Sequence, residues 1–215
     1  MRPASVIFDC DGVLVDSEPP TFELLAEDLA GRGLDLSHAE IERLFLGGTM
    51  PGVYAKAKEL GADMPDDWVQ VFYERLYERL AQGTLLIPGI IGVMDALDRA
   101  SIPYAVGSNG SQRKMRVTLG QHPGVMERLA GRIFSGQEIG RPKPAPDLYL
   151  HAARALGVPP ESCVVIEDSP TGARAAAAAG MRCFGYAPHD DGAKLRIEGA
   201  IPFRSMADLP ALLEL

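Results

Sequence analysis

Short apolar runs that end abruptly at polar residues recur along this chain, and they restrict its fold more than any other feature. The first run, Val6-Ile7-Phe8, stops at Asp9. Similar runs follow at 104–106, 132–134, 163–166 and, more weakly, 182–186. Helical patterns lie between them, at about 89–100, 111–119, 146–156 and 170–179. Short strands that alternate with helices of this length indicate a parallel sheet covered on both faces. We therefore predict an α/β fold built on a parallel sheet.

The stretch from about Ser17 to Leu85 breaks this alternation, because it contains successive helical patterns and no convincing strand. Pro19-Pro20 suits the first turn of a helix, and Ser37-His38-Ala39-Glu40 is a capping box that opens another. We predict a core domain made of residues 1–16 and 86–215, interrupted by a helical insertion over residues 17–85.

Composition narrows the class of protein. The chain has 215 residues, with 21 Lys and Arg against 29 Asp and Glu, so its net charge is −8. This acidic balance argues against a binder of nucleic acid or of anionic membranes. No apolar run approaches the roughly 20 residues of a membrane span. Three cysteines are too few for a disulfide framework, and the first strand starts too early for a signal peptide. We expect a cytoplasmic enzyme that is a monomer, with no nucleic-acid or membrane partner.

Two aspartates at the end of the first run are the first candidates for chemistry. Ligands of open α/β sheets bind beyond the carboxyl ends of the strands, where Asp9-Cys10-Asp11-Gly12 begins. Because side chains alternate along a strand, Asp9 and Asp11 should point the same way. Two carboxylates this close repel each other unless a cation or a proton lies between them. Mg²⁺ suits the pair, since it binds carboxylates, water and substrate phosphate.

Three further polar segments follow the ends of other runs. Ser108-Asn109-Gly110 offers a hydroxyl and the amides of a turn, which can bind an anion. Lys143 stands in the proline-rich segment 141–146, whose stiffness fixes the ammonium group. Glu167-Asp168 offers carboxylates that complete a divalent-ion site. Each segment alone has an ordinary structural explanation, but together at one sheet edge they suit a phosphoryl group with Mg²⁺.

The order of these four segments resembles the haloacid dehalogenase superfamily, and in particular its branch of phosphatases similar to β-phosphoglucomutase. Residues 8–18 resemble the first motif of the family, and 108–110, 143–147 and 167–169 its second, third and fourth. The resemblance covers residues 5 to about 186. It implies a Rossmann-like core with a helical cap domain inserted after the first strand, which corresponds to residues 17–85.

The resemblance also implies roles for single residues. Asp9 would be the catalytic nucleophile and form an aspartyl-phosphate, and Asp11 would protonate the leaving oxygen and then activate water. The phosphate-binding residues would be Ser108, Asn109 and Lys143. The Mg²⁺ ligands would be Asp9, the backbone carbonyl of Asp11, and Asp168, with Glu167 as a further ligand or as a neighbour of the ligands. The chain would bend at Asp16-Ser17, where the cap meets the core.

The implied activity is Mg²⁺-dependent hydrolysis of a small phosphorylated metabolite. A sugar phosphate, or a sugar-acid phosphate such as 6-phosphogluconate, is the expected substrate. A sugar-phosphate mutase of the β-phosphoglucomutase type is the nearest alternative. The mutase holds a second phosphate with a Lys and an Arg, where this chain has Leu46 and Met50, and its His falls at Thr21. Neutral residues at those positions favour simple hydrolysis.

Other classes share part of this pattern. A haloacid dehalogenase has the nucleophile but lacks a second aspartate, so Asp11 counts against it. A phospho-accepting receiver domain combines an acidic cluster, a hydroxyl and a lysine, but it is a shorter single domain without an insertion. A pure binding module would need a degenerate site, and none of the four motifs is broken.

Overall fold

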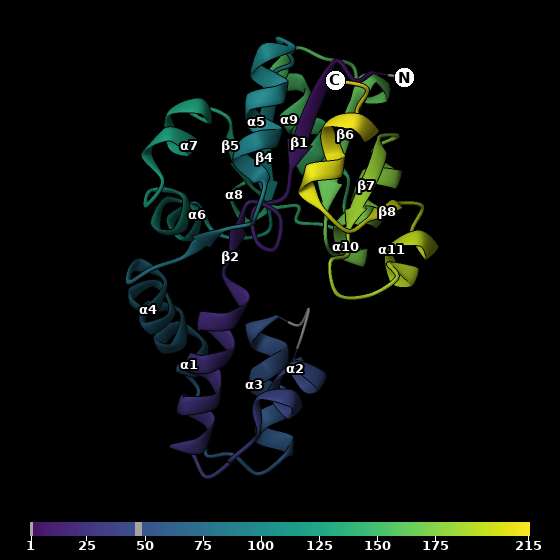
Figure 1. Cartoon of the computed structure of the whole chain (residues 1–215). Coiled ribbons are helices and arrows are strands. Elements are labelled where there is room, and N and C mark those ends of the chain that lie inside the picture. Colours follow the sequence, from purple (N-terminus) through teal and green to yellow (C-terminus); the bar gives the residue numbers. More distant parts are fainter. Residues whose placement is uncertain (1, 46–48) are drawn as a thin grey trace. The chain divides into compact units, whose positions relative to one another are not determined.

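The computed structural model describes residues 2–45 and 49–215, and Figure 1 shows its helices and strands. The chain divides into two compact units. Unit 1 contains Met1–Asp16 and Leu85–Leu215, and unit 2 is Ser17–Thr84. Among the described residues, no helix is long and apolar enough to cross a membrane.

A six-stranded parallel sheet forms the centre of unit 1, as the alternation of apolar runs predicted. Its strands, in their order across the sheet, are β5 (Ile133–Ser135), β4 (Tyr104–Ser108), β1 (Ser5–Phe8), β6 (Cys163–Glu167), β7 (Arg182–Tyr186) and β8 (Ile201–Phe203). The first strand of the chain therefore lies in the middle, with Phe8 paired to Val106 on one side and Ile166 on the other. The carboxyl ends of β4, β1 and β6 are neighbours at one edge.

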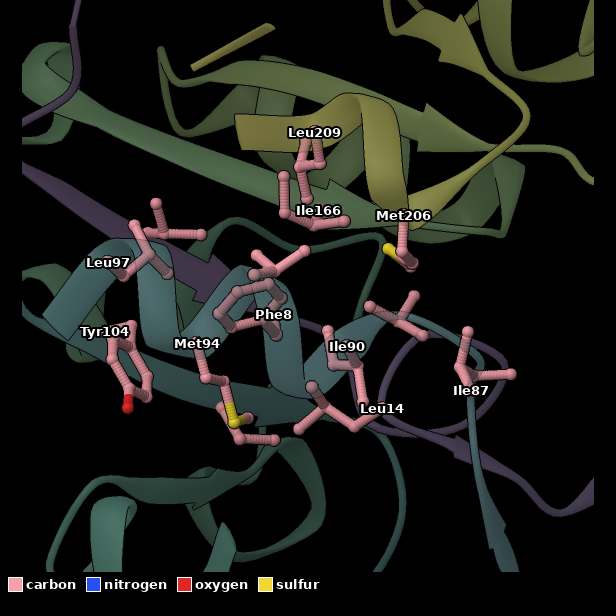
Figure 2. Packing of buried hydrophobic residues seen from close by; sticks show 14 of the residues in the cluster. Phe8, Leu14, Ile87, Ile90, Met94, Leu97, Tyr104, Ile166, Met206 and Leu209 are labelled. Carbon is pink, nitrogen blue, oxygen red and sulfur yellow. The ribbon is translucent and has the colours of Figure 1, made fainter. Parts of the chain in front are cut away.

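Helices cover both faces of this sheet. They are α5 (Ile90–Arg99), α6 (Gln112–Leu119), α7 (Pro123–Arg128), α8 (Gly136–Ile139), α9 (Asp147–Leu156), α10 (Pro170–Ala178), α11 (Ala193–Ile197) and α12 (Leu209–Leu212), with single 3₁₀ turns at Pro160–Ser162 and Met206–Asp208. Because side chains alternate along β1, Val6 and Phe8 enter one apolar cluster while Ile7 enters the other. Figure 2 shows part of the first cluster, in which Phe8 packs with residues of α5 such as Met94. Burial on both faces fixes β1, and with it the position of Asp9.

Three short strands were not predicted. The strand β8 has three residues and contains Pro202, which removes a backbone donor and suits only an edge strand. A separate antiparallel pair joins β2 (Val15–Asp16) to β3 (Leu85–Leu86), at the two places where the chain passes between the units. Strands of two residues are too short to produce a periodic pattern, and Pro202 weakens the strand signal of Ile201–Phe203.

Unit 2 consists, in its described part, of four helices: α1 (Glu18–Ala30), α2 (His38–Phe45), α3 (Met50–Glu59) and α4 (Trp68–Ala81). The helix α1 packs against α2 and α4, and α3 packs against α4. Half of the predicted capping box is present: the Glu40 carboxylate accepts the Ser37 backbone N–H at 2.9 Å, and the Ser37 hydroxyl donates to the same carboxylate at 2.6 Å. Inside the unit, Trp68 stacks on Phe72 with ring centroids 4.8 Å apart. An apolar interior of its own explains why this segment is a compact unit.

Candidate active site

The Lys143 ammonium group is the centre of the site. Its Nζ donates to Asp9 Oδ1 at 2.5 Å and to Glu167 Oε1 at 2.6 Å, and all three side chains are buried. Asp9 follows β1 directly, and Glu167 ends the neighbouring strand β6. The fold thus brings the first, third and fourth motif segments into direct contact.

The side chain of Asn109 holds the loop that carries Lys143. Its Oδ1 accepts the Lys143 backbone N–H at 2.8 Å, and its Nδ2 donates to the Lys143 carbonyl at 3.1 Å. Gly136 makes room for this contact, because a Cβ there would lie 2.8 Å from Asn109 Oδ1 and 3.0 Å from Pro142 Cα. Asn109 was selected from the sequence as a phosphate-binding residue; in the structure its side-chain amide fixes the backbone of Lys143.

Glu167 receives hydrogen bonds on both carboxylate oxygens. Oε1 accepts Lys143 Nζ and the Tyr149 hydroxyl, at 2.6 and 2.8 Å. Oε2 accepts the backbone N–H groups of Asp168 and Ser169 and the Ser169 hydroxyl, at 3.0, 2.9 and 2.8 Å. A carboxylate offers about four lone-pair sites, so these donors fill the hydrogen-bond acceptor sites of Glu167. Gly172 is required beside it, since a Cβ there would lie 1.6 Å from Glu167 Oε1.

The charges of this group shift one another's pKa values. Burial raises the pKa of Asp9 above its ordinary value; the Lys143 charge opposes the shift, and the Glu167 and Asp11 charges add to it. Burial would also raise the pKa of Glu167, but the Lys143 ammonium and the hydrogen bonds to Glu167 hold that pKa below its ordinary value. For Lys143, burial is outweighed by Asp9 and Glu167, so its pKa rises. The two carboxylates therefore favour the charged form of Lys143.

Asp11 has a different partner. Its Oδ1 lies 2.8 Å from Nζ of Lys114, which belongs to α6. Burial would lower the pKa of Lys114, but the charge and hydrogen bond of Asp11 raise it above the ordinary value. Ser111 caps α6 by accepting the Lys114 backbone N–H at 3.1 Å, which places Lys114 in the first turn. Side chains in a first turn lean toward the helix N-terminus, and here that direction leads to the strand ends.

Three carboxylates form a cluster that fits a divalent cation. Oxygen atoms of Asp9, Glu167 and Asp168 all lie within 4.8 Å of one another. Gly12 makes room for Asp168, because a Cβ there would lie 2.0 Å from Asp168 Oδ2. A set of oxygen donors suits Mg²⁺, which prefers carboxylates and water. Of the metal ligands selected from the sequence, Asp9 and Asp168 contribute carboxylates to this cluster, whereas the Asp11 carboxylate pairs with Lys114.

Ser108 completes the set at the end of β4. It is buried, and its Oγ accepts the Gly110 backbone N–H at 3.0 Å. This bond tightens the turn between β4 and α6, so the amides of the turn stay at the same sheet edge as Asp9. The selected residues from all four segments thus meet at the carboxyl ends of β1, β4 and β6.

The family model of haloacid dehalogenase-like hydrolases matches residues 4–180. The chain belongs to this family. The membership predicted from the four motif segments is therefore confirmed, and so is the Rossmann-like parallel α/β core.

Characterised relatives resemble this hydrolase over most of its length. It is 29% identical over 212 residues to 6-phosphogluconate phosphatase of Escherichia coli K12, an alignment that covers 98% of this chain and 95% of the relative. It is 31% identical over 184 residues to hexitol phosphatase A of the same organism, covering 84% and 81%. A crystal structure of a HAD family hydrolase from Deinococcus radiodurans R1, with bound phosphate and sodium, superposes with a TM-score of 0.84 at 37% identity, covering 99% of this chain and 96% of that one.

Two residues that contact the site of the hydrolase, Lys114 and Tyr149, are not predicted from the sequence. Lys114 carries a weak signal, because it lies one turn after the helix cap that follows the second motif. Tyr149 carries none that separates it from an ordinary core tyrosine, since it is a buried residue of α9. Both contacts depend on which elements pack together.

Proposed function

We propose that this hydrolase cleaves a small phosphate monoester in a Mg²⁺-dependent reaction that passes through an aspartyl-phosphate on Asp9. The observation that carries the proposal is the buried contact of Lys143 with both Asp9 and Glu167, beside Asp168. Asp9 faces a fixed ammonium group, which suits a negatively charged substrate such as a phosphate ester. It also belongs to an acidic cluster, which suits a bound cation.

In the first half of the reaction, an oxygen of Asp9 attacks the phosphorus atom, and the bond from phosphorus to the leaving oxygen breaks. Asp11 gives its proton to that leaving oxygen. The Asp11 carboxylate lies outside the acidic cluster, and its contact with Lys114 fixes where it lies. In the second half, Asp11 takes a proton from water, whose oxygen attacks the phosphorus and releases Asp9 and phosphate.

Charge on the phosphoryl oxygens is balanced by donors at the sheet edge. We propose that these oxygens are bound by Lys143, the Ser108 hydroxyl and the Asn109 backbone amide. Lys143 has three N–H donors, and two go to Asp9 and Glu167, so one remains for a phosphoryl oxygen. The donor also stays fixed, because Asn109 holds the Lys143 backbone.

Mg²⁺ would be held by the carboxylates of Asp9 and Asp168 and by the backbone carbonyl of Asp11. When bound, it would neutralise part of the charge that Asp9 and the phosphoryl group bring together. Glu167 is better suited to anchoring Lys143 than to binding the ion, since its oxygens already accept several hydrogen bonds.

The substrate class we propose is a sugar phosphate or a sugar-acid phosphate such as 6-phosphogluconate. Relatives named for 6-phosphogluconate and hexitol phosphates support this class. Unit 2 is proposed as the cap that selects the substrate, with the chain bending at Asp16-Ser17. Of the two positions that correspond to the mutase grip, Leu46 lies outside the described residues and Met50 is the first residue of α3. A neutral Met50 favours hydrolysis over mutase activity.

A phosphate-release screen tests the proposal. The purified protein is incubated with 6-phosphogluconate, hexitol phosphates, phosphoglycolate, nucleotides and p-nitrophenyl phosphate, with Mg²⁺ and after exhaustive chelation. We expect release that needs Mg²⁺ and is abolished in Asp9→Asn. The matched control is Asp98→Asn, which alters a carboxylate bonded to Tyr104 and Arg128 but not to the site. Full activity after chelation, or in Asp9→Asn, would contradict the proposal.

A further inference from the structure

Tyr149 touches the central ion pair of the site with both its hydroxyl group and its ring. The hydroxyl donates to Glu167 Oε1 at 2.8 Å. The ring centroid lies 4.8 Å from Lys143 Nζ, within the range of a cation–π contact. The side chain is fully buried. One tyrosine therefore contacts both partners of the Lys143–Glu167 pair.

The two contacts restrict the same ammonium group. Lys143 and the Tyr149 hydroxyl share Glu167 Oε1 as acceptor, so the phenol fixes where that oxygen can lie. The ring limits the directions that the ammonium group can take, because a cation is attracted to the ring face. Burial and the charge of Glu167 raise the pKa of Tyr149 well above its ordinary value, so the hydroxyl remains a donor.

We propose that Tyr149 is a positioning residue that directs the remaining N–H of Lys143 toward the phosphoryl group at Asp9. The inference rests on the proposed phosphatase function. The hydroxyl and the ring of Tyr149 each make a separate contribution to the position of the ammonium group. Without the hydroxyl, Glu167 Oε1 loses one hydrogen bond, and the carboxylate can move together with the Lys143 ammonium group. Without the ring, the ammonium group loses its cation–π contact and the steric limit on that side.

Tyr104 offers a matched control in the same unit. It is also a buried tyrosine, 2% exposed, and its hydroxyl donates to a carboxylate, Asp98 Oδ1, at 3.0 Å. Its ring packs edge-on against Phe8 at 6.1 Å. Asp98 contacts Arg128 and no residue of the site. Tyr104→Phe therefore removes the same chemical group from the core without changing Lys143.

The experiment compares Tyr149→Phe, Tyr149→Leu and Tyr104→Phe with the unaltered protein. For each we would measure kcat and KM for p-nitrophenyl phosphate, the dissociation constant of inorganic phosphate in the presence of Mg²⁺ by calorimetry, and Tm. Loss of one hydrogen bond should weaken phosphate binding in Tyr149→Phe by about 3- to 10-fold and lower kcat/KM to a similar degree. Tyr149→Leu should lose more. Tyr104→Phe should lower Tm and leave both kinetic and binding constants within about twofold.

Equal phosphate affinity and equal kcat/KM in Tyr149→Phe and Tyr104→Phe would overturn the inference and leave Tyr149 a packing residue. If Tyr149→Leu does not fold, the comparison of the two phenylalanine variants decides. An unaltered protein that hydrolyses no ester would contradict the proposed function. The calorimetric phosphate affinities would then decide the inference, because they require no turnover.

Discussion

The indole Nε1 of Trp68 donates a 2.6 Å hydrogen bond to Oδ2 of Asp28 inside unit 2. Asp28 is 7% exposed, and it also accepts hydrogen bonds from Arg32 and Arg75. A buried carboxylate of α1 thus contacts α4 through the Trp68 indole and the Arg75 guanidinium group, while Arg32 binds it from the turn after α1. Trp68 is the only tryptophan in the sequence, so its fluorescence reports on this unit alone.

Acid should weaken unit 2 through Asp28. Burial would raise the pKa of Asp28, but hydrogen bonds from Arg32 and Trp68 and the charges of Arg32 and Arg75 hold it below its ordinary value. A carboxyl group with a lower pKa in the folded state adds stability above the unfolded pKa, about 3.9 for Asp. That stability is lost as the pH falls below about 4. We expect the denaturant midpoint, followed by Trp68 fluorescence, to fall in this window.

Asp28→Asn provides the control for the acid titration. It keeps an acceptor for Trp68 but removes the charge that pairs with Arg32 and Arg75, at a cost of about 1–3 kcal/mol at pH 7. Its denaturant midpoint should therefore depend less on pH than the midpoint of the unaltered protein. The comparison is made between about pH 5 and pH 3, where an Asp side chain titrates. Identical acid dependence in the two proteins would contradict the role of Asp28.

Gly172→Ala should damage the site although it is a small change in a helix. Its Cβ would lie 1.6 Å from Glu167 Oε1, so Glu167 must leave Lys143 and Tyr149 or α10 must shift. We expect a lower Tm and a loss of phosphate-release activity beyond the loss of folded protein. Gly92→Ala in α5 is the control, because nothing lies within 4 Å of the added carbon. That variant should be unchanged or stabilised by about 0.5–1 kcal/mol.

Substituting the two aspartates of the first motif should reduce activity in different ways. Asp9→Asn removes the proposed nucleophile and should abolish turnover of every ester. Asp11→Asn removes the proposed proton donor, which contributes roughly 10²–10⁴-fold, and its loss should be smaller for esters with good leaving groups. Comparing p-nitrophenyl phosphate with a sugar phosphate measures the difference. A loss in Asp11→Asn that is the same for both esters would exclude proton donation to the leaving oxygen.

Substrate choice should respond to the start of α3. Met50→Arg places a cation at the position that the resemblance matches to the phosphate grip of the mutase. Thr49, which caps α3 through the Gly52 N–H at 3.3 Å, is unaltered. We expect tighter binding of a bisphosphorylated sugar through charge-assisted hydrogen bonds, with hydrolysis of p-nitrophenyl phosphate nearly unchanged. Met50→Gln controls for size and polarity without charge. If neither variant changes the ranking of esters, this part of unit 2 does not face the substrate.

The sequence by itself predicted the parallel sheet, the helices found in the described part of Ser17–Thr84, and the four polar segments that we propose carry the chemistry. These features depend on neighbours along the chain. Apolar runs that stop at Asp9 or Glu167 mark buried strands and their ends, and Ser37-His38-Ala39-Glu40 marks a helix start. The parallel topology then requires the strand ends to meet at one edge.

Only the tertiary structure decided which charges pair. Lys143 reaches Asp9 across 134 positions of sequence and Glu167 across 24, and no local pattern encodes either distance. The pairing of Asp11 with Lys114, the clamp of Asn109 on Lys143 and the contact of Tyr149 with Glu167 were likewise absent from the sequence reading. The physical reason is that the spacing of residues along the chain specifies only local structure, such as a strand or a turn. The partner of a buried charge is set by the elements that pack around it, since burial without a partner would be costly.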